Sequence, residues 1–353
     1  MAIRLDFPMN EIPPIVVADI SVYQANYSKY PDIVHFDWDK YYAMGGRAVK
    51  LRFSVGCAGE DFELDYNLSE CLRLGIYIWG YHYAKLWHNL DKQAAIFAVA
   101  IEKAEATGLL LGVYHDIEAN DGLDKNTFTA NAQKLFNKTA ALSDFVILDD
   151  NPAKSNIGPY TRGLFWDYNT YRTDYFKHLP LWIAHHYSET YEVEPYTIPS
   201  WRPLIPDDWA AINNPVGPHW WQFEDYDGGE EWGSNGDDEI DLNWFTWKGG
   251  TYQAFEDRYG VSLLPHEPPP IPDPEPEPEP IPETDRLQME VVQEGLRVRT
   301  GPGTGYAIIG ELPFGQVVDV LDIGGDSAWV RIGEKQWSNV EYYGDKNMKV
   351  VKK

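Results

Sequence analysis

The sequence predicts an α/β fold that forms an irregular TIM-like barrel, followed by a small all-β domain. Three observations support this prediction. Up to about residue 264, apolar β-rich runs alternate with amphipathic helical patterns. Proline then alternates with acidic residues over 265–285, and short strands separated by turn residues fill 286–353. We therefore expect a barrel domain at 1–264, a linker at 265–285 and a second domain at 286–353.

The strand candidates of the first region are apolar on both faces, which is typical of a sheet that is covered by helices or closed on itself. They are Ile15–Ile20, Ala48–Val55, Gly75–Tyr83, Leu110–Ile117, Ile157–Thr161, Leu181–His186 and His219–Phe223. The length of this region fits a single barrel.

Two long helices are expected between these strands. Asp91–Thr107 has Asp91 as a candidate N-cap and Gly108 as its stop, and Asp124–Leu142 begins at a second candidate cap. After about residue 180 no helical pattern follows until Tyr252–Tyr259. The barrel should therefore be irregular, with later strands that close it through loops.

The linker, Pro265–Asp285, lacks basic residues and should be an extended polyproline-II spacer. At ~3.1 Å per residue it could span about 65 Å. Downstream, Leu287–Val351 is rich in glycine and β-branched residues and is interrupted by turns, as in a small all-β barrel.

The charge of the chain narrows the classes of partner. Its 353 residues include 29 Lys and Arg against 55 Asp and Glu, for a formal net charge of −26. Of this charge, −19 falls on residues 1–264, −7 on 265–285 and 0 on 286–353. Nucleic acids and anionic membrane surfaces attract clustered Lys and Arg, so the sequence disfavours both as partners. We expect a monomer.

The cysteine content and the N-terminal sequence indicate in which cellular compartment the protein is expected. Cys57 and Cys71 are too few for a disulfide framework, and two free thiols are expected, with a single bridge as the alternative. The first apolar run, Ile15 to Ala18, is too short for a signal peptide. No stretch is long and apolar enough for a membrane-spanning helix.

Acidic residues stand at the ends of several strand candidates. Asp116 and Glu118 end one strand and point to the same side, because strand side chains alternate, with Cα atoms ~6 to 7 Å apart. Two carboxylates at the carboxyl end of barrel strands suit glycosidic-bond cleavage. The alternative is an acidic strand end that caps a helix or pairs with an arginine. Asp19 and Asp241 end other strands, and four such acids favour a catalytic site.

Aromatic residues occur at or near the same strand ends, where flat rings could stack on sugars. They are Tyr81, Tyr83, Tyr160, Trp166, Trp182, Tyr187, Trp220 and Trp221. We expect about half of them to line a groove and the others to belong to the core.

Ordered motifs over about residues 15–250 carry a family resemblance. They are Asp19-Ile-Ser21, Gly80-Tyr-His-Tyr83, Asp116-Ile-Glu118, Gly158-Pro-Tyr-Thr161, Leu181-Trp-Ile-Ala-His185, Trp221-Gln-Phe223 and Ile240-Asp-Leu-Asn243. The region resembles the family-25 glycoside hydrolases, the lysozyme or muramidase family of phage endolysins and bacterial autolysins. The resemblance implies five βα units closed by three further strands. It also implies hydrolysis of the β-1,4 bond between N-acetylmuramic acid and N-acetylglucosamine.

The resemblance also implies roles for individual residues. Glu118 would be the proton donor, Asp116 would position or polarise the substrate, and Asp19 and Asp241 would complete the acidic site. The expected substrate-binding residues are Arg52, Tyr83, Tyr160, Trp182, Trp221 and Gln222. Retaining, inverting and substrate-assisted mechanisms all stay open.

One motif departs from the family. Many relatives carry Lys-Ala-Thr-Glu-Gly on the second strand, where this chain reads Arg52-Phe-Ser-Val-Gly56. Arg52 can replace the charge of the lysine, but Val55 stands where the relatives have an acid. This difference concerns substrate contacts and leaves the reaction class unchanged.

The C-terminal region resembles a bacterial SH3 domain through Gly295–Gly303, Gly310–Val317 and Trp329–Ile332. Such modules are associated with binding of cell-wall peptides. Trp329, Trp337 and Tyr342 are the candidate wall-binding residues, with a place in the small core as the alternative.

These observations predict a peptidoglycan hydrolase in which the barrel binds the glycan strand and the SH3 domain binds the wall peptide. The alternatives are a catalytically inactive wall-binding protein and a glycosidase for another amino-sugar polymer. The expected setting is a phage or prophage endolysin that stays in the host cytoplasm until lysis. The chemistry requires no cofactor, and no metal site is expected, because Asp225–Asp238 lacks the ligand spacing of a calcium loop.

Overall fold

The computed structural model divides the chain into two compact units, Met1–Ile271 and Pro272–Lys353, and each is described by itself. It describes residues 3–4, 15–26, 33–149, 154–186, 203–210, 218–226, 229–236, 240–263, 288–301, 308–320, 322–324, 329–333, 336–339, 341–342, 345–346 and 348–350. The proposed linker 265–285 lies outside the described residues.

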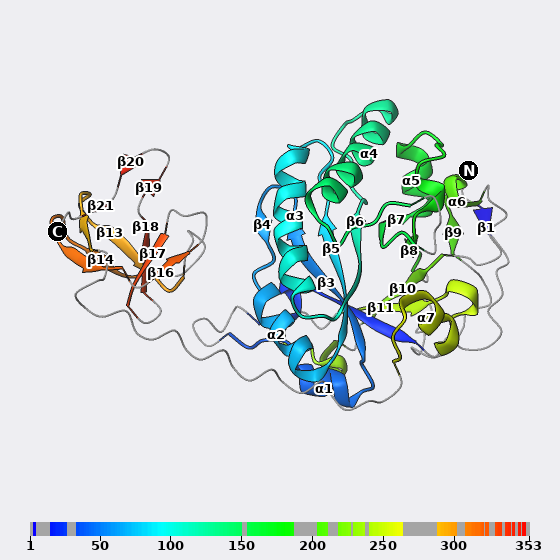
Figure 1. Cartoon of the computed structure of the whole chain (residues 1–353), viewed down its shortest axis with the longest axis horizontal. Coiled ribbons are helices and arrows are strands. Elements are labelled where there is room, and N and C mark those ends of the chain that lie inside the picture. Colours follow the sequence, from blue (N-terminus) through cyan, green and yellow to red (C-terminus); the bar gives the residue numbers. More distant parts are fainter. Residues whose placement is uncertain are drawn as a thin grey trace. The chain divides into compact units, whose positions relative to one another are not determined.

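A closed barrel of eight strands forms the centre of the first unit, within the residues described (Figure 1). The strands are β2 (Val16–Ile20), β3 (Ala48–Val55), β5 (Tyr77–Tyr83), β6 (Leu110–Asp116), β7 (Ile157–Arg162), β8 (Trp182–Ala184), β10 (Trp220–Tyr226) and β11 (Ile240–Phe245). The pairs from β2 through β10 are parallel. β11 is antiparallel to both β10 and β2 and closes the sheet. A short strand, β4 (Gly59–Glu60), pairs antiparallel with the end of β3.

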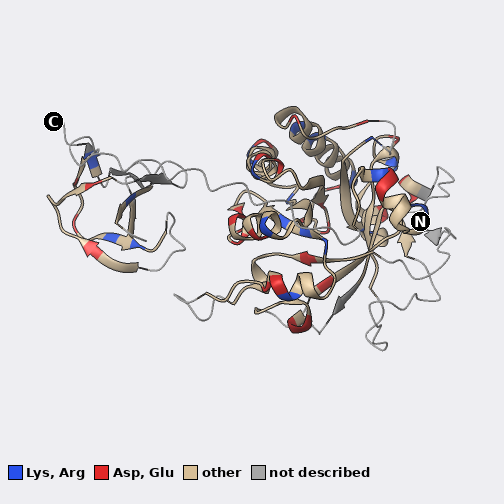
Figure 2. Cartoon of the chain, turned by 60° about the horizontal axis from the view of Figure 1, so that its bottom comes forward, with Lys and Arg blue, Asp and Glu red and all other residues tan. Residues whose placement is uncertain are grey.

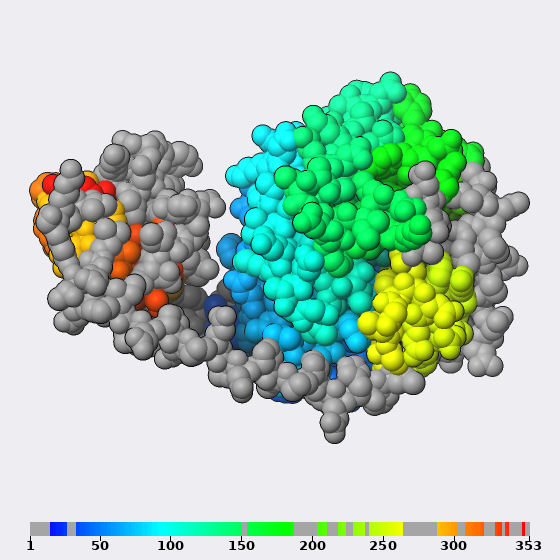
Figure 3. Space-filling model, in the orientation of Figure 1, coloured from blue at the N-terminus to red at the C-terminus, as the bar shows by residue number. Residues whose placement is uncertain are grey.

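Helices follow the first five barrel strands and lie outside the sheet (Figure 1). They are α1 (Trp38–Ala43), α2 (Leu64–Leu74), α3 (Leu90–Glu105), α4 (Lys125–Leu142) and α5 (Gly163–Asn169). After them the described helices are short: α6 (Asp207–Ala210) and α7 (Tyr252–Tyr259). Figure 3 shows α2 to α4, in blue to green, covering one side of the barrel, with α7 in yellow beside them. This arrangement confirms the predicted irregular barrel of five βα units and three closing strands.

The long helices lie where the periodicity predicts them, with one error at a cap. Asp124 caps α4 as expected, since its side chain accepts from the backbone N–H groups of Asn126 and Thr127. The N-cap of α3 is Asn89, which accepts from Lys92 N at 3.1 Å. The expectation that Asp91 caps this helix is therefore wrong. Asp91 lies in the first turn, where its exposed carboxylate pairs with Lys138 of α4.

Alternation along the strands produces two apolar layers. On β6, for example, Val113 belongs to the cluster between sheet and helices, whereas Tyr114 belongs to the cluster inside the barrel. Inward positions therefore recur at every second residue, and Asp116 shares the inward side with Tyr114. Tryptophan, tyrosine and phenylalanine fill much of the barrel interior below the site: Trp79, Tyr114, Trp182, Trp220 and Phe245.

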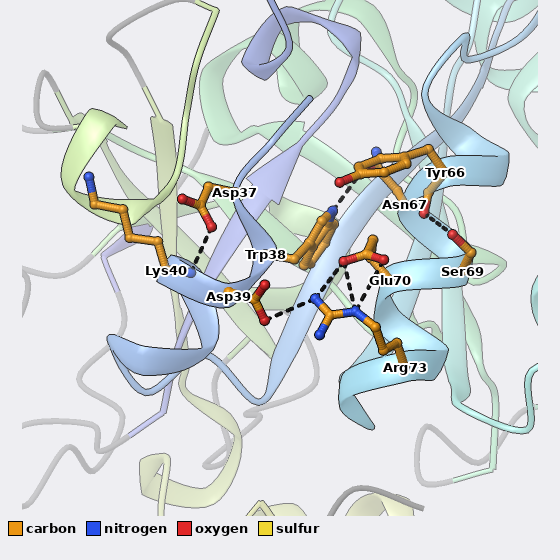
Figure 4. Close-up of polar contacts among 9 residues, drawn as sticks. All are labelled: Asp37, Trp38, Asp39, Lys40, Tyr66, Asn67, Ser69, Glu70 and Arg73. Carbon is orange, nitrogen blue, oxygen red and sulfur yellow. Dashed lines mark hydrogen bonds and ion pairs between the residues drawn. The ribbon is translucent and has the colours of Figure 1, made fainter. Parts of the chain in front are cut away.

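Polar contacts, one buried and others at the surface, hold α1 against α2 (Figure 4). Trp38 of α1 is buried and donates its indole N–H to Asn67 Oδ1 of α2 at 3.2 Å. Arg73 of α2 pairs with Asp39 at 3.0 Å and with Glu70 at 2.6 Å. Figure 2 shows acidic and basic residues interspersed on the barrel helices, so the excess negative charge does not exclude local ion pairs.

The second unit is a small all-β structure, as predicted. Its strands are β12 (Gln288–Val291), β13 (Leu296–Arg299), β14 (Ile308–Leu312), β15 (Val317–Asp319), β16 (Asp322–Gly324), β17 (Trp329–Gly333), β18 (Gln336–Asn339), β19 (Glu341–Tyr342), β20 (Asp345–Lys346) and β21 (Met348–Val350). They form a five-stranded sheet, β14-β13-β18-β17-β16, a three-stranded sheet, β15-β12-β21, and the pair β19-β20. A separate core includes Val291, Val298 and Val330.

Two further observations concern the cysteines and membrane-spanning helices. Cys57 and Cys71 are free thiols, which agrees with the first of the two alternatives drawn from the sequence. In the part of the chain that is described, no helix is long and apolar enough to cross a membrane.

Candidate active site

The four acids singled out in the sequence lie together in one cleft at the end of the barrel. Asp19 comes from β2, Asp116 from the end of β6, Glu118 from two residues beyond it, and Asp241 from β11. The cleft has a volume of about 560 Å³. Its described lining residues are Asp19, Ser21, Tyr23, Gln24, Arg52, Val55, Tyr81, Tyr83, Lys85, Asp116, Glu118, Tyr160, Gln222 and Asp241.

Strand register explains why residues so distant in sequence meet here. Asp241 on β11 is the direct partner of Asp19 on β2. Across the barrel, Asp116 is in register with Tyr83 of β5 and with Tyr160 of β7. Each of these positions has the inward parity of its strand, so the pleat points all five side chains to the same enclosed space.

Asp19 is buried, with 7% of its surface exposed. Burial raises its pKa to about 7, because a charged carboxylate loses solvation there. A hydrogen bond from Tyr81 and the charges of Lys50 and Arg52 oppose this rise. Asp19 can therefore change its charge near neutral pH.

The pKa values of Asp116 and Glu118 are also raised, which favours the protonated form of each carboxyl. Burial raises the pKa of Asp116 well above its usual range, and the neighbouring carboxylates of Glu118 and Asp19 add to the rise. Burial raises the pKa of Glu118 too, while Arg162 and His186 act in the opposite direction. The Oδ1 atom of Asp116 is buried and has no hydrogen-bond partner among the residues described. A carboxyl oxygen in this state can bond to a ligand in the cleft.

A hydrogen-bond network orients the wall of the cleft beside Asp19. Gln222 accepts at Oε1 from the Tyr160 hydroxyl at 2.6 Å and from His186 Nε2 at 3.0 Å. Its amide nitrogen is 3.4 Å from Asp19 Oδ2 and can donate to it. Gln222 is buried, so these bonds fix its side chain in one orientation.

The expected cation and the substituted acid position both line the cleft on β3, the strand that pairs with β2 of Asp19. Arg52 lines the cleft, and its Nε lies 2.7 Å from Asp61 Oδ2. Its guanidinium also lies 4.9 Å from the ring centroid of Tyr23. Val55 lines the cleft at the position where the resemblance implies an acid in relatives. Part of the positive charge of Arg52 is thus already neutralised by Asp61.

Two expected substrate-binding tryptophans lie elsewhere. Trp182 and Trp221 are both almost completely buried, and neither lines the cleft. Trp182 faces the barrel interior, where its indole N–H donates to Asn243 at 2.6 Å. Trp221 faces the helices, because it has the opposite parity to Gln222. Their burial argues against sugar stacking and corrects the expectation.

Lys50 was not among the candidate site residues, and Tyr81 was named only as one of the aromatic residues that could line a groove. Tyr81 lines the cleft and bonds to Asp19, and it shares its inward parity with Tyr83. Lys50 is fully buried below the cleft, in register with Asp19, and its Nζ lies 3.3 Å from the ring centroid of Trp182. Lys50 lies two residues before Arg52 on the same strand, and side chains two residues apart point to the same face. The sequence therefore contained the information that Lys50 faces the barrel interior, as Arg52 does.

The candidate wall-binding residues differ in exposure. Trp329 on β17 is buried, with 7% exposed, which favours a structural role. Trp337 on β18 is half-buried and keeps part of its ring accessible. Tyr342 belongs to β19, and its side chain lies outside the described residues.

Among the described residues, no three His, Cys, Asp or Glu side chains are placed to bind a metal ion. The acidic segment Asp225–Asp238 lies partly outside the described residues.

Comparison with known proteins gives two family matches. The model of glycosyl hydrolases family 25 matches residues 18–211, more than half of the chain, and the bacterial SH3 domain model matches 294–346. None of the curated proteins matches the sequence.

Several solved structures are similar to the barrel unit. A family 25 glycosyl hydrolase from Bacillus anthracis is 17% identical, with 72% of this chain and 100% of that chain covered and a TM-score of 0.48. A lysozyme from Streptomyces coelicolor is 16% identical, with coverages of 70% and 98% and a TM-score of 0.49. The catalytic domain of endolysin ply40, from bacteriophage P40 of Listeria monocytogenes, is 19% identical, with coverages of 67% and 94% and a TM-score of 0.44.

Proposed function

Because this chain belongs to glycosyl hydrolase family 25 and carries a bacterial SH3 domain, and is thus a peptidoglycan hydrolase, we propose that it cleaves the β-1,4 bond between N-acetylmuramic acid and N-acetylglucosamine. The observation that carries the proposal is the convergence of Asp19, Asp116, Glu118 and Asp241 in one cleft. An enclosed group of carboxyls with unequal environments can divide into an acid and charge-stabilising partners.

Glu118 is the general acid in this proposal. Burial raises its pKa, so that it can hold a proton, yet it is less buried than Asp116 and lies at the rim where a sugar oxygen can reach it. Its proton passes to the glycosidic oxygen as the bond from the anomeric carbon to that oxygen breaks. A water molecule then supplies the hydroxyl group of the new reducing end, and its remaining proton returns to the site.

Asp116 positions the sugar that becomes the new reducing end. Its buried Oδ1 has no partner among the described residues and is available to the 2-acetamido group of that sugar. Asp19 and Asp241, which are direct register partners, face the same centre and can stabilise positive charge at the anomeric carbon. The Tyr160 and Gln222 network holds Asp19 in place.

The second domain is proposed to hold the enzyme on its substrate. We place the catalytic barrel at 1–264, the linker at 265–285 and the wall-binding domain at 286–353, in a chain that acts as a monomer. The wall peptide is the proposed ligand of the SH3 domain, and Trp337 is the candidate residue there with an accessible ring.

The test is digestion of purified peptidoglycan followed by mass analysis of the reducing ends. Muramic acid at the new reducing ends is expected, and glucosamine there would contradict the proposal. Glu118→Gln should abolish turnover while the circular dichroism spectrum stays unchanged. The matched control is Glu102→Gln on the exposed face of α3, which should retain full activity. A wild-type protein as inert as Glu118→Gln would instead indicate a wall-binding protein without catalysis.

A further inference from the structure

A second pocket is lined by residues from the ends of β7 and β8, from α5 and from β9 (Leu204–Ile205). Figure 1 shows where these four elements lie in the first unit. Its volume is about 400 Å³. Its described lining residues are Arg162, Gly163, Leu164, Phe165, Ala184, His185, His186 and Leu204. The proposed reaction does not require this pocket.

Tight packing builds the pocket into the fold. A Cβ atom on Gly163 would lie 2.2 Å from the backbone oxygen of Leu204, so the start of α5 and β9 are in direct contact. The backbone N–H of Leu204 donates to His185 Nδ1 at 3.0 Å, which fixes this imidazole. The indole N–H of Trp221 also donates to the carbonyl oxygen of His185 at 3.0 Å.

Two residues of the pocket adjoin residues that line the catalytic cleft. Arg162 lies two positions after Tyr160 on β7, and Tyr160 lines the cleft. His186 donates to Gln222, which also lines the cleft. Both Arg162 and His186 are near enough to Glu118 to lower its pKa. A substituent on a sugar bound at Glu118 is thus within reach of the pocket.

The pocket and the cleft differ in their charged residues. The described lining of the pocket contains one arginine and no acidic residue, whereas four acids line the cleft together with Arg52 and Lys85. Arg162 makes no ion pair with any residue that the structure describes. Leu164, Phe165 and Leu204 provide an apolar surface next to this cation. The lining therefore suits a ligand that combines small apolar groups with a carboxylate.

We propose that this pocket is a subsite for the carboxylate-bearing peptide that is attached to the lactyl group of muramic acid. The inference rests on the proposed function, because it takes the muramic acid residue to be bound at Glu118. The lactyl and alanine methyl groups of the peptide contact the apolar surface, and a peptide carboxylate pairs with Arg162. The enzyme then prefers glycan strands that carry peptides over strands that lack them.

The experiment compares kcat/KM for peptide-bearing glycan strands with kcat/KM for the same strands after removal of the peptides. The wild-type enzyme should prefer the peptide-bearing strands. Arg162→Gln should reduce that preference about fivefold, as expected for a partly exposed ion pair. Because Arg162 also acts on Glu118, this variant can slow both reactions, and the ratio of the two kcat/KM values is the informative quantity.

A charge-reversal pair at Leu164 gives an independent measurement. Leu164 is 62% exposed at the pocket, so Asp or Lys at this position should not impair folding. Leu164→Asp should lower the preference for peptide-bearing strands about threefold, and Leu164→Lys should raise it by a similar factor. Tyr168 lies one helical turn further along α5, is 78% exposed and does not line the pocket. Tyr168→Asp and Tyr168→Lys are therefore the matched controls and should leave the preference unchanged.

The outcomes separate the two proposals. A wild-type enzyme that cleaves both substrates equally well, or Leu164 variants that behave like the Tyr168 variants, would overturn the subsite while leaving the hydrolase assignment intact. A wild-type enzyme that cleaves neither substrate would overturn the proposed function itself.

Discussion

Asp19 and Lys50 are opposite charges on neighbouring strands, and both are buried at the base of the catalytic cleft. Burial disfavours the charged form of each, raising the pKa of Asp19 to about 7 and lowering the pKa of Lys50 well below its usual value. Such pairs seldom add stability, because the cost of desolvation offsets the attraction between the charges. Their place next to the acids suggests that they serve the site at the expense of stability.

Replacement of Asp19 by Asn should therefore stabilise the protein at alkaline pH. A carboxyl with a raised folded-state pKa favours the folded state only while it stays protonated, so its contribution is lost as pH rises from about 4 to about 7. At about pH 8 we expect Asp19→Asn to raise the free energy of unfolding by roughly 2 to 4 kcal/mol. At about pH 3 the variant and the wild type should be equal. Urea unfolding at both values measures this, and equal stability at both would contradict the raised pKa.

Lys50 leads to a second prediction at this scale. Its Nζ has no hydrogen-bond partner among the described residues and faces the ring of Trp182. Methionine has a similar length and no polar group to desolvate, so Lys50→Met should stabilise the protein by about 1 to 2 kcal/mol near neutral pH. Lys103→Met is the control, because the ion pairs of Lys103 with Glu60 and Asp65 lie at the surface. It should lower stability by no more than about 1 kcal/mol.

At the scale of elements, the two candidate caps of α3 can be separated by experiment. Asn89 accepts a backbone hydrogen bond from the first turn, whereas Asp91 makes a side-chain ion pair on the surface. Asn89→Ala should lower the free energy of unfolding by about 1 kcal/mol, the usual cost of a lost N-cap. Asp91→Ala should cost no more than about half as much, since an exposed ion pair contributes little. A larger loss from Asp91→Ala in chemical denaturation would contradict this assignment.

The strands and their alternation account for what the sequence predicts correctly. Apolar runs locate the barrel strands, and the period of two places Asp116 and Glu118 on one side. The same period puts Trp182 and Trp221 on opposite faces of the sheet, but it does not tell how deep each lies. Depth depends on register across the closed barrel. Register pairs Trp182 with Trp220, and both rings are buried inside the barrel. The pattern of a single strand contains no information about this pairing.

The short helices show a similar limit. α1 and α5 have only six and seven residues, too few for a clear helical period, and their positions depend on tertiary contacts. The indole N–H of Trp166 on α5, for example, donates to Asp208 of α6 at 2.8 Å. Contacts of this kind join segments that are distant in sequence. No local pattern in the sequence predicts them.

At the scale of the whole molecule, the proposed function assigns catalysis to the barrel and attachment to the C-terminal unit. The net charge of −26 lies mainly in the barrel region and the linker, and wall polymers are often anionic. General electrostatic attraction should therefore not hold the barrel on a wall. Residues 286–353 carry no net charge and contain a core of their own, so in the proposed function they bind the wall without help from the barrel.

Deletion of residues 265–353 tests this division. The barrel has its own two-layered core and should stay folded without them. Activity on small glycan fragments should remain, because they reach the cleft by diffusion. Activity on intact walls should fall about tenfold or more, because tethering raises the local concentration of the barrel at its substrate. Equal activity of the two proteins on whole walls would exclude an anchoring role.

The cause of such a fall can be isolated by adding the C-terminal unit, residues 286–353, back as a separate chain. Tethering acts only through a covalent connection, so the added unit should not restore activity on walls. At high concentration it should instead inhibit the full-length enzyme, because it occupies the same wall ligands. Restoration by the separate unit would mean that it alters the wall or the barrel directly, and the linker would then serve no purpose in attachment. If the separate unit inhibits the full-length enzyme and does not restore the activity of the shortened one, the second unit acts only by raising the local concentration of the barrel at the wall.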